Sequence, residues 1–246
     1  DLSDKLYDLF LDKTRQYSCA YFESKKDSLY QAQLNKMDRL ADKLHLKKGD
    51  KVLDIGCGWG SLSRHFSSKY NCSIKGISLS EEQISYCLKE QKSLKNTQYL
   101  EYSLQDYRNE TNFYDKIVSV GMFEHVGKPF YNAYFKKISD LLSDDGIAVI
   151  HTIGNVRTPK LTPAFIRKYI FPGGYIPTLS EIMPAVEKSG LIINDIEVLR
   201  LHYADTLRNW YKNFKKAEKQ VLDLYDERFV RMWESYLNLS EISFRK

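Results

Sequence analysis

The chain of 246 residues has no long apolar stretch, and its purely apolar runs, such as Ile147–Ile150, extend over only a few residues. A membrane-spanning helix needs about 20 apolar residues, so the sequence predicts no such helix. No basic segment followed by an apolar run stands at the start, so no signal peptide is expected. The first residue is Asp rather than Met, which is compatible with a fragment or a processed form.

Cysteine pairs and an excess of one charge are also missing. None of the four cysteines forms a CxxC pair, so no zinc site or other metal site is expected, and reduced thiols are the default in a cytosolic protein. With 37 basic and 32 acidic residues, the net charge of +5 is too small to specify an acidic partner, and no nucleic-acid partner is expected. A content of 43% hydrophobic and 28% charged residues is typical of a folded globular chain.

Short apolar segments alternate with helical segments from Lys51 onward. The expected strands are 51–55, 72–78, 97–102, 114–120, 147–153 and 191–199, and the expected helices are 61–70, one from Ser80, 130–142 and 180–189. Ser80 and Gln83 have the spacing of a capping box, and Asp144-Asp145-Gly146 ends the third helix. This alternation predicts a doubly wound α/β fold with a mostly parallel sheet covered on both faces.

Residues outside this alternation are expected to be helical or to form a lid. The first 46 residues and those from Ala204 have apolar side chains at helical spacing. Between 155 and 178 the alternation is interrupted by a segment rich in proline and glycine, with Arg167 and Lys168 inside an aromatic stretch. A long insertion after the carboxyl end of a strand is typical of a lid.

The most specific motif follows the first predicted strand. Asp54 is followed by Gly56, Gly58 and Gly60, and glycines let a ligand approach the backbone at a helix N-terminus. A dinucleotide fingerprint would place its third glycine or alanine at Ser61, so the spacing speaks against a nicotinamide loop. The D-x-G-x-G-x-G form instead resembles the nucleotide loop of class I S-adenosylmethionine (SAM) methyltransferases. A plain glycine-rich turn is the simpler alternative.

Seven segments together resemble one enzyme family. The sequence is similar to cyclopropane-fatty-acyl-phospholipid synthases and mycolic acid cyclopropane synthases in residues 17–22, 54–60, 78–83, 105–108, 121–127, 151–154 and 169–174. The resemblance implies a class I SAM-dependent methyltransferase fold. It implies one catalytic domain over 1–246, with a helical cap at 1–46, a lid at 155–178 and helical elements at 204–246. By the same resemblance, the N-terminal domain and the last strand of the family are expected to lie outside this sequence.

The resemblance also implies site residues. Asp106 would hold the adenine amino group, Tyr107 would pack near the ring, and Gln83 would contact the ribose hydroxyls in place of an acidic residue. The full set expected at SAM is Tyr17, Ser18, Asp54, Gly56, Gly58, Gly60, Ser78, Leu79, Gln83, Gln105, Asp106, Tyr107 and Val120. The set expected around a bound bicarbonate is Cys19, Glu124, His151, Ile153 through its backbone, and Tyr211.

The implied reaction transfers a methylene group from SAM to the cis double bond of an unsaturated phospholipid acyl chain and forms a cyclopropane ring. Alkylation of an alkene creates a carbocation that water would capture, so the site must be dry. Bicarbonate would remove the proton that ring closure releases, and Glu124 would accept a hydrogen bond from its hydroxyl. Such a substrate implies a cytoplasmic protein at the inner membrane surface; a homodimer stays open.

Four alternatives remain at this stage. A methyltransferase of the same fold could act on a lipid or a small amine without ring closure. Cys19 could be a covalent nucleophile, although cysteine is commonly a small buried group. A nicotinamide-dependent oxidoreductase and a non-catalytic SAM-binding lipid carrier complete the set. The joint presence of Cys19, Glu124, His151 and Tyr211 favours the ring-forming reaction.

Overall fold

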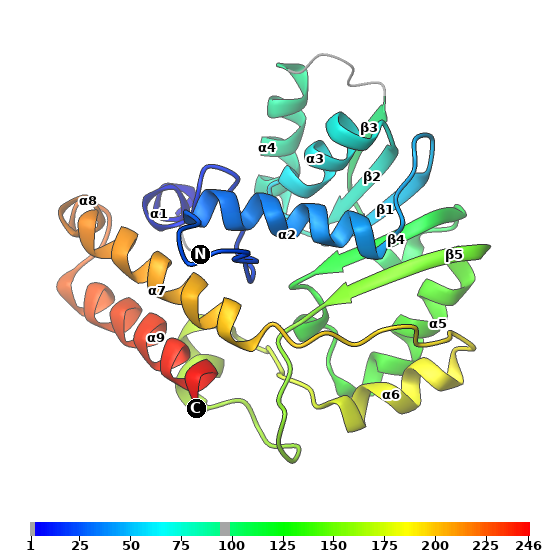
Figure 1. Ribbon diagram of the computed structural model, residues 1–246. Helices are drawn as coiled ribbons and strands as arrows, with labels where there is room; N and C mark the ends of the chain where they lie inside the picture. Colours follow the sequence, from blue (N-terminus) through cyan, green and yellow to red (C-terminus); the bar gives the residue numbers. More distant parts are fainter. Residues whose placement is uncertain (1–2, 94–98) are drawn as a thin grey trace. The chain divides into compact units, whose positions relative to one another are not determined.

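The computed structural model describes residues 3–93 and 99–246 (Figure 1). The chain forms two compact units, of which the first combines Asp1–Arg39 with Glu197–Lys246 and the second comprises Leu40–Ile196. Within the described residues, no helix is long and apolar enough to cross a membrane. Part of the strand expected at 97–102 lies outside the described residues, as does the start of the chain.

The second unit contains a parallel sheet, as the sequence predicts. Five strands lie in the order β3-β2-β1-β4-β5, and every neighbouring pair is parallel. The strands are β1 (Lys51–Ile55), β2 (Ser73–Ser78), β3 (Leu100–Leu104), β4 (Tyr114–Val120) and β5 (Leu142–His151). The strand order turns back between β1 and β4, and ligands of open α/β sheets bind in the crevice at such a switch point.

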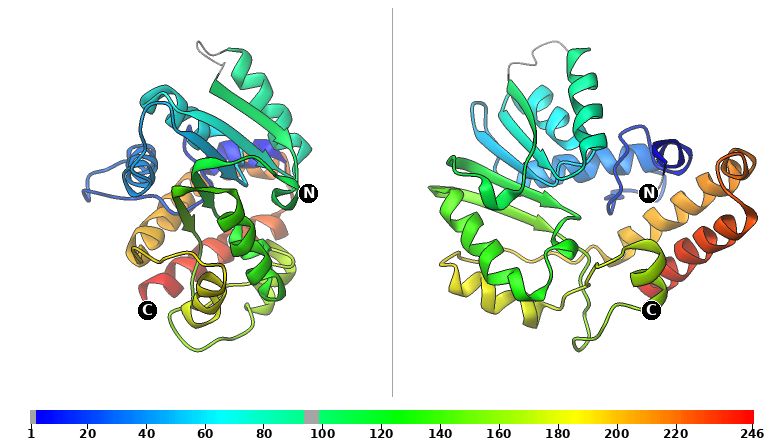
Figure 2. Two further views of the ribbon diagram at one scale, coloured as in Figure 1. Left: turned by 90° about the vertical axis from the view of Figure 1, so that its right-hand side faces the viewer. Right: turned by 180° about the vertical axis from the view of Figure 1, so that it is seen from behind.

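Helices cover both faces of this sheet. Right-handed crossovers place α3 (Ser61–Tyr70) and α4 (Glu81–Lys92) on one face and α5 (Tyr131–Leu141) on the other (Figure 2). The helix α6 (Leu179–Lys188) packs against α5 through Ile182, Ala185 and Val186, which belong to the same apolar core as Leu53 and Ile117. The observed helices agree with those predicted to within one or two residues.

The strand expected at 191–199 is not formed, so this prediction is wrong. The segment carries apolar residues at strand-like spacing, yet Ile192 is 86% exposed and the backbone of 191–199 belongs to no ladder. A strand needs a neighbour for its backbone groups, and alternation of side chains alone does not supply one.

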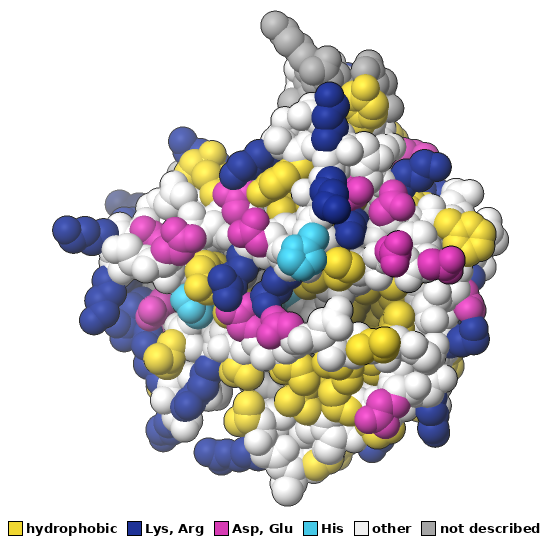
Figure 3. All heavy atoms as spheres, turned by 45° about the vertical axis from the view of Figure 1, so that its right-hand side comes forward, with side chains coloured by type: hydrophobic (Ala, Val, Ile, Leu, Met, Phe, Trp, Pro, Cys, Tyr) yellow, Lys and Arg dark blue, Asp and Glu magenta, His cyan; other side chains and the backbone are white. Residues whose placement is uncertain are grey.

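Hydrophobic side chains gather on the face where β5 and α6 lie (Figure 3).

The strand β5 also differs from its predicted bounds. It begins at Leu142 and ends at His151, and therefore excludes Thr152 and Ile153. The residues Asp144-Asp145-Gly146, expected to end a helix, fall in a register shift where Lys116 pairs with Ile147. A bulge of this kind absorbs extra residues without ending the strand.

The expected lid segment is closed at its base. Asn155 and Thr178 form an isolated bridge, and the Asn155 N–H donates to the carbonyl of Pro177 at 2.7 Å. Between them lies a wide helical turn at Ile166–Ile170 (η5). At the start of α6, the Thr178 side chain and Glu181 form a capping box that fixes where this excursion ends.

The first unit is helical and aromatic. Its helices are α1 (Asp4–Phe10), the start of α2 (Leu29–Lys43), α7 (Arg200–Lys216), α8 (Glu218–Leu222) and α9 (Glu227–Arg245). Phe10 contacts Tyr17, Trp210 and Trp233 edge to face, with ring centroids 5.7–6.0 Å apart. Such aromatic contacts tie α1, α7 and α9 together.

A buried carboxylate holds the carboxyl end of β3. Glu110 is 1% exposed and pairs with Lys75 at 2.7 Å, while the N–H groups of Thr111 and Asn112 donate to its other oxygen. Gln105 also donates to Glu110 at 3.0 Å. Although burial opposes ionisation, the bond from Lys75 and these backbone bonds lower the pKa of Glu110 to about 2.

We therefore expect Glu110→Gln to lower the free energy of unfolding by roughly 3 kcal/mol at pH 7, because it leaves the charge of Lys75 without its buried partner. In the parent protein the contribution of Glu110 is complete above about pH 4.5 and is lost as the pH falls toward 2. The matched control is Glu101→Gln on the same lysine. That carboxylate is 63% exposed and 3.5 Å away, so its loss should cost under about 1 kcal/mol. Equal effects in urea unfolding would contradict the assignment.

Candidate active site

The carboxyl ends of the strands bring the predicted cofactor residues of the second unit to one edge of the sheet. Ser78 at the end of β2 lies beside Leu104 at the end of β3, and Val120 at the end of β4 lies beside His151 at the end of β5. The chain stays in register beyond the strands, since the Gly121 N–H donates to the carbonyl of His151 at 2.9 Å. These residues were predicted from separate segments, and the sheet aligns them.

The turn after β1 has a backbone that glycine favours. Gly56, Gly58 and Gly60 all have positive φ, at 80°, 54° and 72°. A Cβ on Gly56 would come within 2.8 Å of Met122, whereas a Cβ on Gly58 would meet no atom within 4 Å. Open space beside Gly58 at the N-terminus of α3 gives a ligand access to the backbone.

Asp54 is held inside the protein beneath this turn. It is 2% exposed, and its carboxylate accepts a hydrogen bond from the Ser63 hydroxyl at 2.7 Å. Ser63 lies in the first turn of α3, so this bond ties the end of β1 to the helix that follows. No sequence motif indicated Ser63, because its role depends on how the turn folds.

The end of β2 carries exposed and hydrogen-bonded groups. The Ser80 hydroxyl accepts from the Gln83 N–H, which is half of the expected capping box. The reciprocal half is not formed, because the Ser78 hydroxyl donates to the Gln83 side-chain oxygen at 2.9 Å and accepts from the Ser80 N–H. Leu79 between them is 73% exposed. A polar pair and an exposed apolar side chain thus stand together at this strand end.

Side-chain hydrogen bonds hold the chain at the end of β3. Gln105 is fixed by Glu110, and the Asp106 side chain accepts from the Arg108 N–H at 2.9 Å and caps the short turn η2 (Tyr107–Asn109). The Arg108 guanidinium beside Asp106 lowers the pKa of that carboxyl. The half-buried Tyr107 ring meets Tyr134 edge to face at 5.3 Å.

Glu124 is the most unusual group at this edge. It lies in the short turn η3 (Phe123–His125) after β4, and its Oε1 accepts from the Ile153 N–H at 2.7 Å. Its other oxygen, Oε2, is buried and has no hydrogen-bond partner among the described residues. Burial, opposed by the bond from Ile153, raises the pKa of Glu124. A buried carboxylate oxygen without a partner calls for an explanation, and a perturbed pKa at the carboxyl ends of the strands makes Glu124 a candidate ligand-binding group.

The surroundings of Glu124 include the base of the lid segment. The Tyr175 N–H donates to the Glu124 carbonyl at 2.9 Å, and the Tyr175 hydroxyl donates to Glu181 at 2.8 Å. Lys128 pairs with Glu181 at 2.9 Å and, despite its burial, lowers the pKa of that carboxyl to about 2. The lid segment is therefore anchored to the turn that carries Glu124.

The other predicted residues belong to the first unit. Tyr17 donates to or accepts from Tyr236 at 3.0 Å and packs on Trp210 at 5.1 Å, while Ser18 and Cys19 follow it as buried residues. Tyr211 is half-buried on α7.

Burial raises the pKa of the Cys19 thiol to about 12, although Lys36 and Thr206 act against this shift. A thiol that stays protonated at neutral pH does not favour Cys19 as a covalent nucleophile.

Two buried polar residues that sequence reasoning missed support Ser18. Gln33 donates to the Ser18 carbonyl at 3.0 Å, and the Lys36 ammonium donates to the Ser18 hydroxyl at 2.9 Å. Both come from α2, three residues apart and on one face. A buried lysine in an amphipathic helix has no sequence signal, because the partner that accepts its charge lies far along the chain.

No group of three or more His, Cys, Asp or Glu side chains in the described ranges could hold a metal ion. The candidate chemistry at the sheet edge consists of glycine backbone, hydroxyl and amide groups near β1 and β2, and a buried carboxylate after β4.

Known proteins are similar to this chain in sequence and in fold. The family model for mycolic acid cyclopropane synthetase matches residues 1–246. The cyclopropane-fatty-acyl-phospholipid synthase of Escherichia coli strain K12 is 40% identical over 245 residues, which are 100% of this chain and 63% of that protein. The chain thus spans less than two thirds of the length of this relative.

Solved structures agree. The cyclopropane synthase MmaA2 from Mycobacterium tuberculosis has a TM-score of 0.94 at 31% identity and covers 100% of this chain and 90% of its own. Mycolic acid cyclopropane synthase CmaA1 complexed with SAH and CTAB has a TM-score of 0.93 at 32% identity, with 99% and 90% covered.

The fold is confirmed as that of class I SAM-dependent methyltransferases, and the resemblance of the seven sequence segments is confirmed over the whole length. The chain belongs to the mycolic acid cyclopropane synthetase family.

Proposed function

We propose that this chain transfers a methylene group from SAM to the cis double bond of unsaturated phospholipid acyl chains and closes a cyclopropane ring, with bicarbonate as the base. The observation that carries the proposal is the half-buried Glu124, whose buried Oε2 has no hydrogen-bond partner among the described residues and whose Oε1 accepts from the Ile153 N–H. When bound, SAM supplies an electrophilic methyl group, and bicarbonate takes the proton that this group loses as the ring closes.

The second unit fits SAM through its glycine turn and the end of β2. The positive φ of Gly58 and the space beside it allow a ligand to approach the backbone. Gln83 uses its side-chain oxygen for Ser78, so its amide N–H groups are left to donate to ribose hydroxyls. The CmaA1 neighbour is complexed with SAH, the demethylated form of the same cofactor. Asp106 and Tyr107 stay the proposed contacts of the adenine.

Glu124 fits a bicarbonate ion because one can donate a hydrogen bond that the other accepts. Bicarbonate has one hydroxyl, and Oε2 of an ionised Glu124 is an acceptor for it. Two anions held side by side away from water repel each other unless they share a proton, so the protonation of Glu124 and that of bicarbonate are coupled. His151, Cys19 and Tyr211 stay proposed donors to the remaining oxygens, and Ile153 acts through its backbone.

Water must be excluded while the acyl chain carries positive charge. Phe123 directly precedes Glu124 in η3; its ring lies 4.6 Å from that of Tyr131 and also packs on Tyr134 and Phe135. All four are buried, and aromatic faces attract cations by about 0.5–2 kcal/mol. This apolar floor supports chemistry on an alkene rather than on a hydrated amine.

The lid segment fits a phospholipid surface. Residues 155–178 contain no acidic residue, and their four basic side chains, Arg157, Lys160, Arg167 and Lys168, are exposed. Val156 and Leu161 are 78% and 73% exposed beside them. Exposed apolar groups among cations favour the headgroup region of an anionic membrane, such as the cytoplasmic surface of an inner membrane.

Ring closure can be tested with SAM that carries a trideuterated methyl group. Incubation of the protein with vesicles of an unsaturated phospholipid should give a product that retains two deuterons, because the proposed base removes the third from the transferred group. Mass spectrometry of the acyl chains measures this directly. A product that retains three deuterons would instead support a methyltransferase without ring closure, and an absence of any labelled lipid would contradict both.

Substitution of Glu124 by Gln should lower turnover by about 100-fold or more, because the Gln oxygen must accept from Ile153 and its NH₂ group then faces the hydroxyl of bicarbonate. SAM affinity and the urea midpoint should change little, since Glu124 is not among the residues proposed for SAM. If Glu124→Gln and the parent protein had similar turnover in the presence of excess bicarbonate, this result would contradict the proposed role of Glu124.

Membrane attachment through the lid predicts a loss of vesicle binding in the double variant Arg167→Ala/Lys168→Ala. Two cations at about 1 kcal/mol each correspond to roughly 30-fold weaker binding to phosphatidylglycerol vesicles. The matched control, Lys47→Ala/Lys48→Ala, removes the same charge from two exposed lysines of the same unit. Vesicle flotation should separate the two variants; equal losses would mean that only net charge matters.

A further inference from the structure

The segment from Cys19 to Phe22 is held by two helices of the first unit. The Ala20 N–H donates to the Thr206 hydroxyl at 3.0 Å, and the Phe22 N–H donates to the Nδ1 of His202 at 3.0 Å. Between them, the Tyr21 N–H donates to the Ala32 carbonyl at 2.9 Å. Successive N–H groups of an extended chain point to opposite sides, so α7 takes the first and third and α2 takes the second.

His202 and Thr206 are suited to this task by their spacing. They lie four residues apart on α7 and so share one face of the helix. Thr206 also donates its hydroxyl proton to the His202 carbonyl at 2.7 Å, which leaves its oxygen as an acceptor for Ala20. The Cys19 thiol donates to the Leu199 carbonyl at 3.8 Å, immediately before α7.

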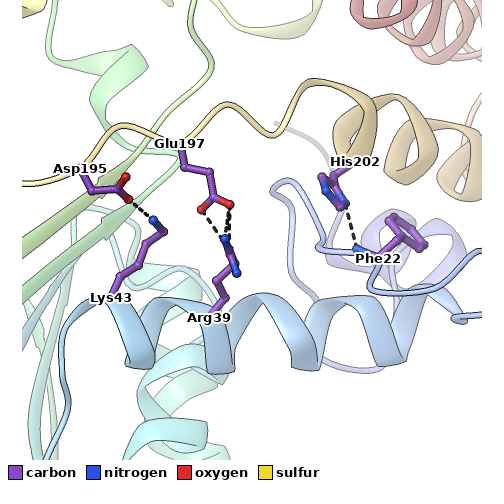
Figure 4. Close-up of polar contacts among 6 residues, drawn as sticks. All are labelled: Phe22, Arg39, Lys43, Asp195, Glu197 and His202. Carbon is purple, nitrogen blue, oxygen red and sulfur yellow. Dashed lines mark hydrogen bonds and ion pairs between the residues drawn. The ribbon is translucent and has the colours of Figure 1, made fainter.

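The hydrogen bond from Phe22 fixes the state of the His202 ring. A nitrogen that accepts cannot carry a proton, so His202 is neutral with its proton on Nε2. Its ring stacks on Tyr21 at 4.5 Å, and the Arg39 guanidinium lies 4.5 Å from the centre of the same Tyr21 ring. Arg39 in turn binds Glu197, and Figure 4 shows this pair together with His202 and Phe22. The figure also draws the pair of Lys43 with Asp195, which belongs to the second unit.

We propose that His202 is a positioning residue for the reaction, because its neutral imidazole anchors the Phe22 N–H and so holds Tyr17, Ser18 and Cys19 in their active placement. This inference rests on the proposed function, in which those residues contact SAM and bicarbonate. Protonation at Nδ1 replaces the acceptor by a second donor facing the Phe22 N–H, and the anchor is lost. Turnover should therefore decrease in acid as His202 takes up a proton.

The charged groups around His202 set where that occurs. Asp205 on α7 and Glu197 before α7 favour the protonated ring, while burial and Arg39 on α2 oppose it. Burial has the largest effect, and the pKa of His202 is lowered below the ordinary value of about 6.5. The hydrogen bond from the Phe22 N–H to His202 is therefore intact at neutral pH and is lost only in more acidic solution. Since the unfolded chain binds the proton more readily, the same bond stabilises the fold above about pH 6.5 and less so in acid.

Two substitutions at His202 separate anchoring from simple packing. His202→Asn keeps an acceptor near the position of Nδ1 and cannot titrate, whereas His202→Ala removes the acceptor. The control is His45→Asn, which changes an exposed histidine at a φ of 48°, a conformation that Asn tolerates well. Each variant is assayed for turnover between pH 5 and 8, and amide-exchange protection factors of Ala20 and Phe22 are measured by NMR in the same range.

We expect the parent protein and His45→Asn to lose Phe22 protection and turnover together as His202 is protonated. His202→Asn should keep Phe22 protected and lack this acid decrease. His202→Ala should lose the protection at every pH, with turnover reduced by about tenfold or more.

An unchanged acid decrease in His202→Asn, or full Phe22 protection in His202→Ala, would overturn the inference. If His202→Ala fails to fold, the Asn variant still decides. A parent protein that binds SAM but forms no ring would contradict the proposed function, whereas the exchange measurement would still uphold or overturn the anchor.

Discussion

The cost of removing a carboxylate from water constrains this chain at two glutamates, whose surroundings act in opposite directions. Glu110 is surrounded by an ammonium and two backbone N–H groups, and its pKa falls to about 2. Glu124 has one backbone N–H and an apolar floor, and its pKa rises. A buried acceptor without a partner lowers the stability of a fold by about 1–3 kcal/mol, so another favourable interaction must offset this loss of free energy. The first glutamate is thus explained by stability, and the second is suited to the ligand that we propose.

Backbone geometry, as well as side-chain chemistry, determines the surroundings of Glu124. Ile153 lies two residues beyond the end of β5, and its N–H reaches Glu124 because the chain there no longer pairs with β4. The carboxyl ends of parallel strands release their last backbone groups at one edge, which is why ligands collect there. The same reasoning applies to the turn after β1, where three glycines have positive φ values and open space lies beside Gly58. The glycine turn and the Glu124 carboxylate thus both lie at the edge formed by the carboxyl ends of the strands.

Local patterns predicted most of this unit, and long-range partners explain the rest. The bounds of β1, β4 and α3 agree with the sequence because apolar runs and glycines act within a few residues. The segment 191–199 has equally good alternation, but a strand requires a neighbour that alternation cannot provide. Likewise Ser80 caps α4 as predicted, whereas Gln83 binds Ser78 rather than the Ser80 N–H, a choice between two nearby donors that spacing does not decide. Lys36 and His202 depend on partners many residues away.

The thiol of Cys19 shows how burial selects among the chemistries that one sequence allows. A nucleophilic cysteine needs a thiolate, and thiolates form where cations or helix N-termini outweigh the loss of solvent. Lys36 is close enough to lower the pKa of Cys19, yet burial outweighs it and the value rises to about 12. The group therefore keeps its proton at neutral pH and can only donate a weak hydrogen bond, with the carbonyls of Ala20 at 3.3 Å and Leu199 at 3.8 Å as acceptors in reach. A weak, uncharged donor is compatible with binding an anion and disfavours acyl transfer, so the physical state of this one side chain supports the ring-forming reaction over covalent catalysis.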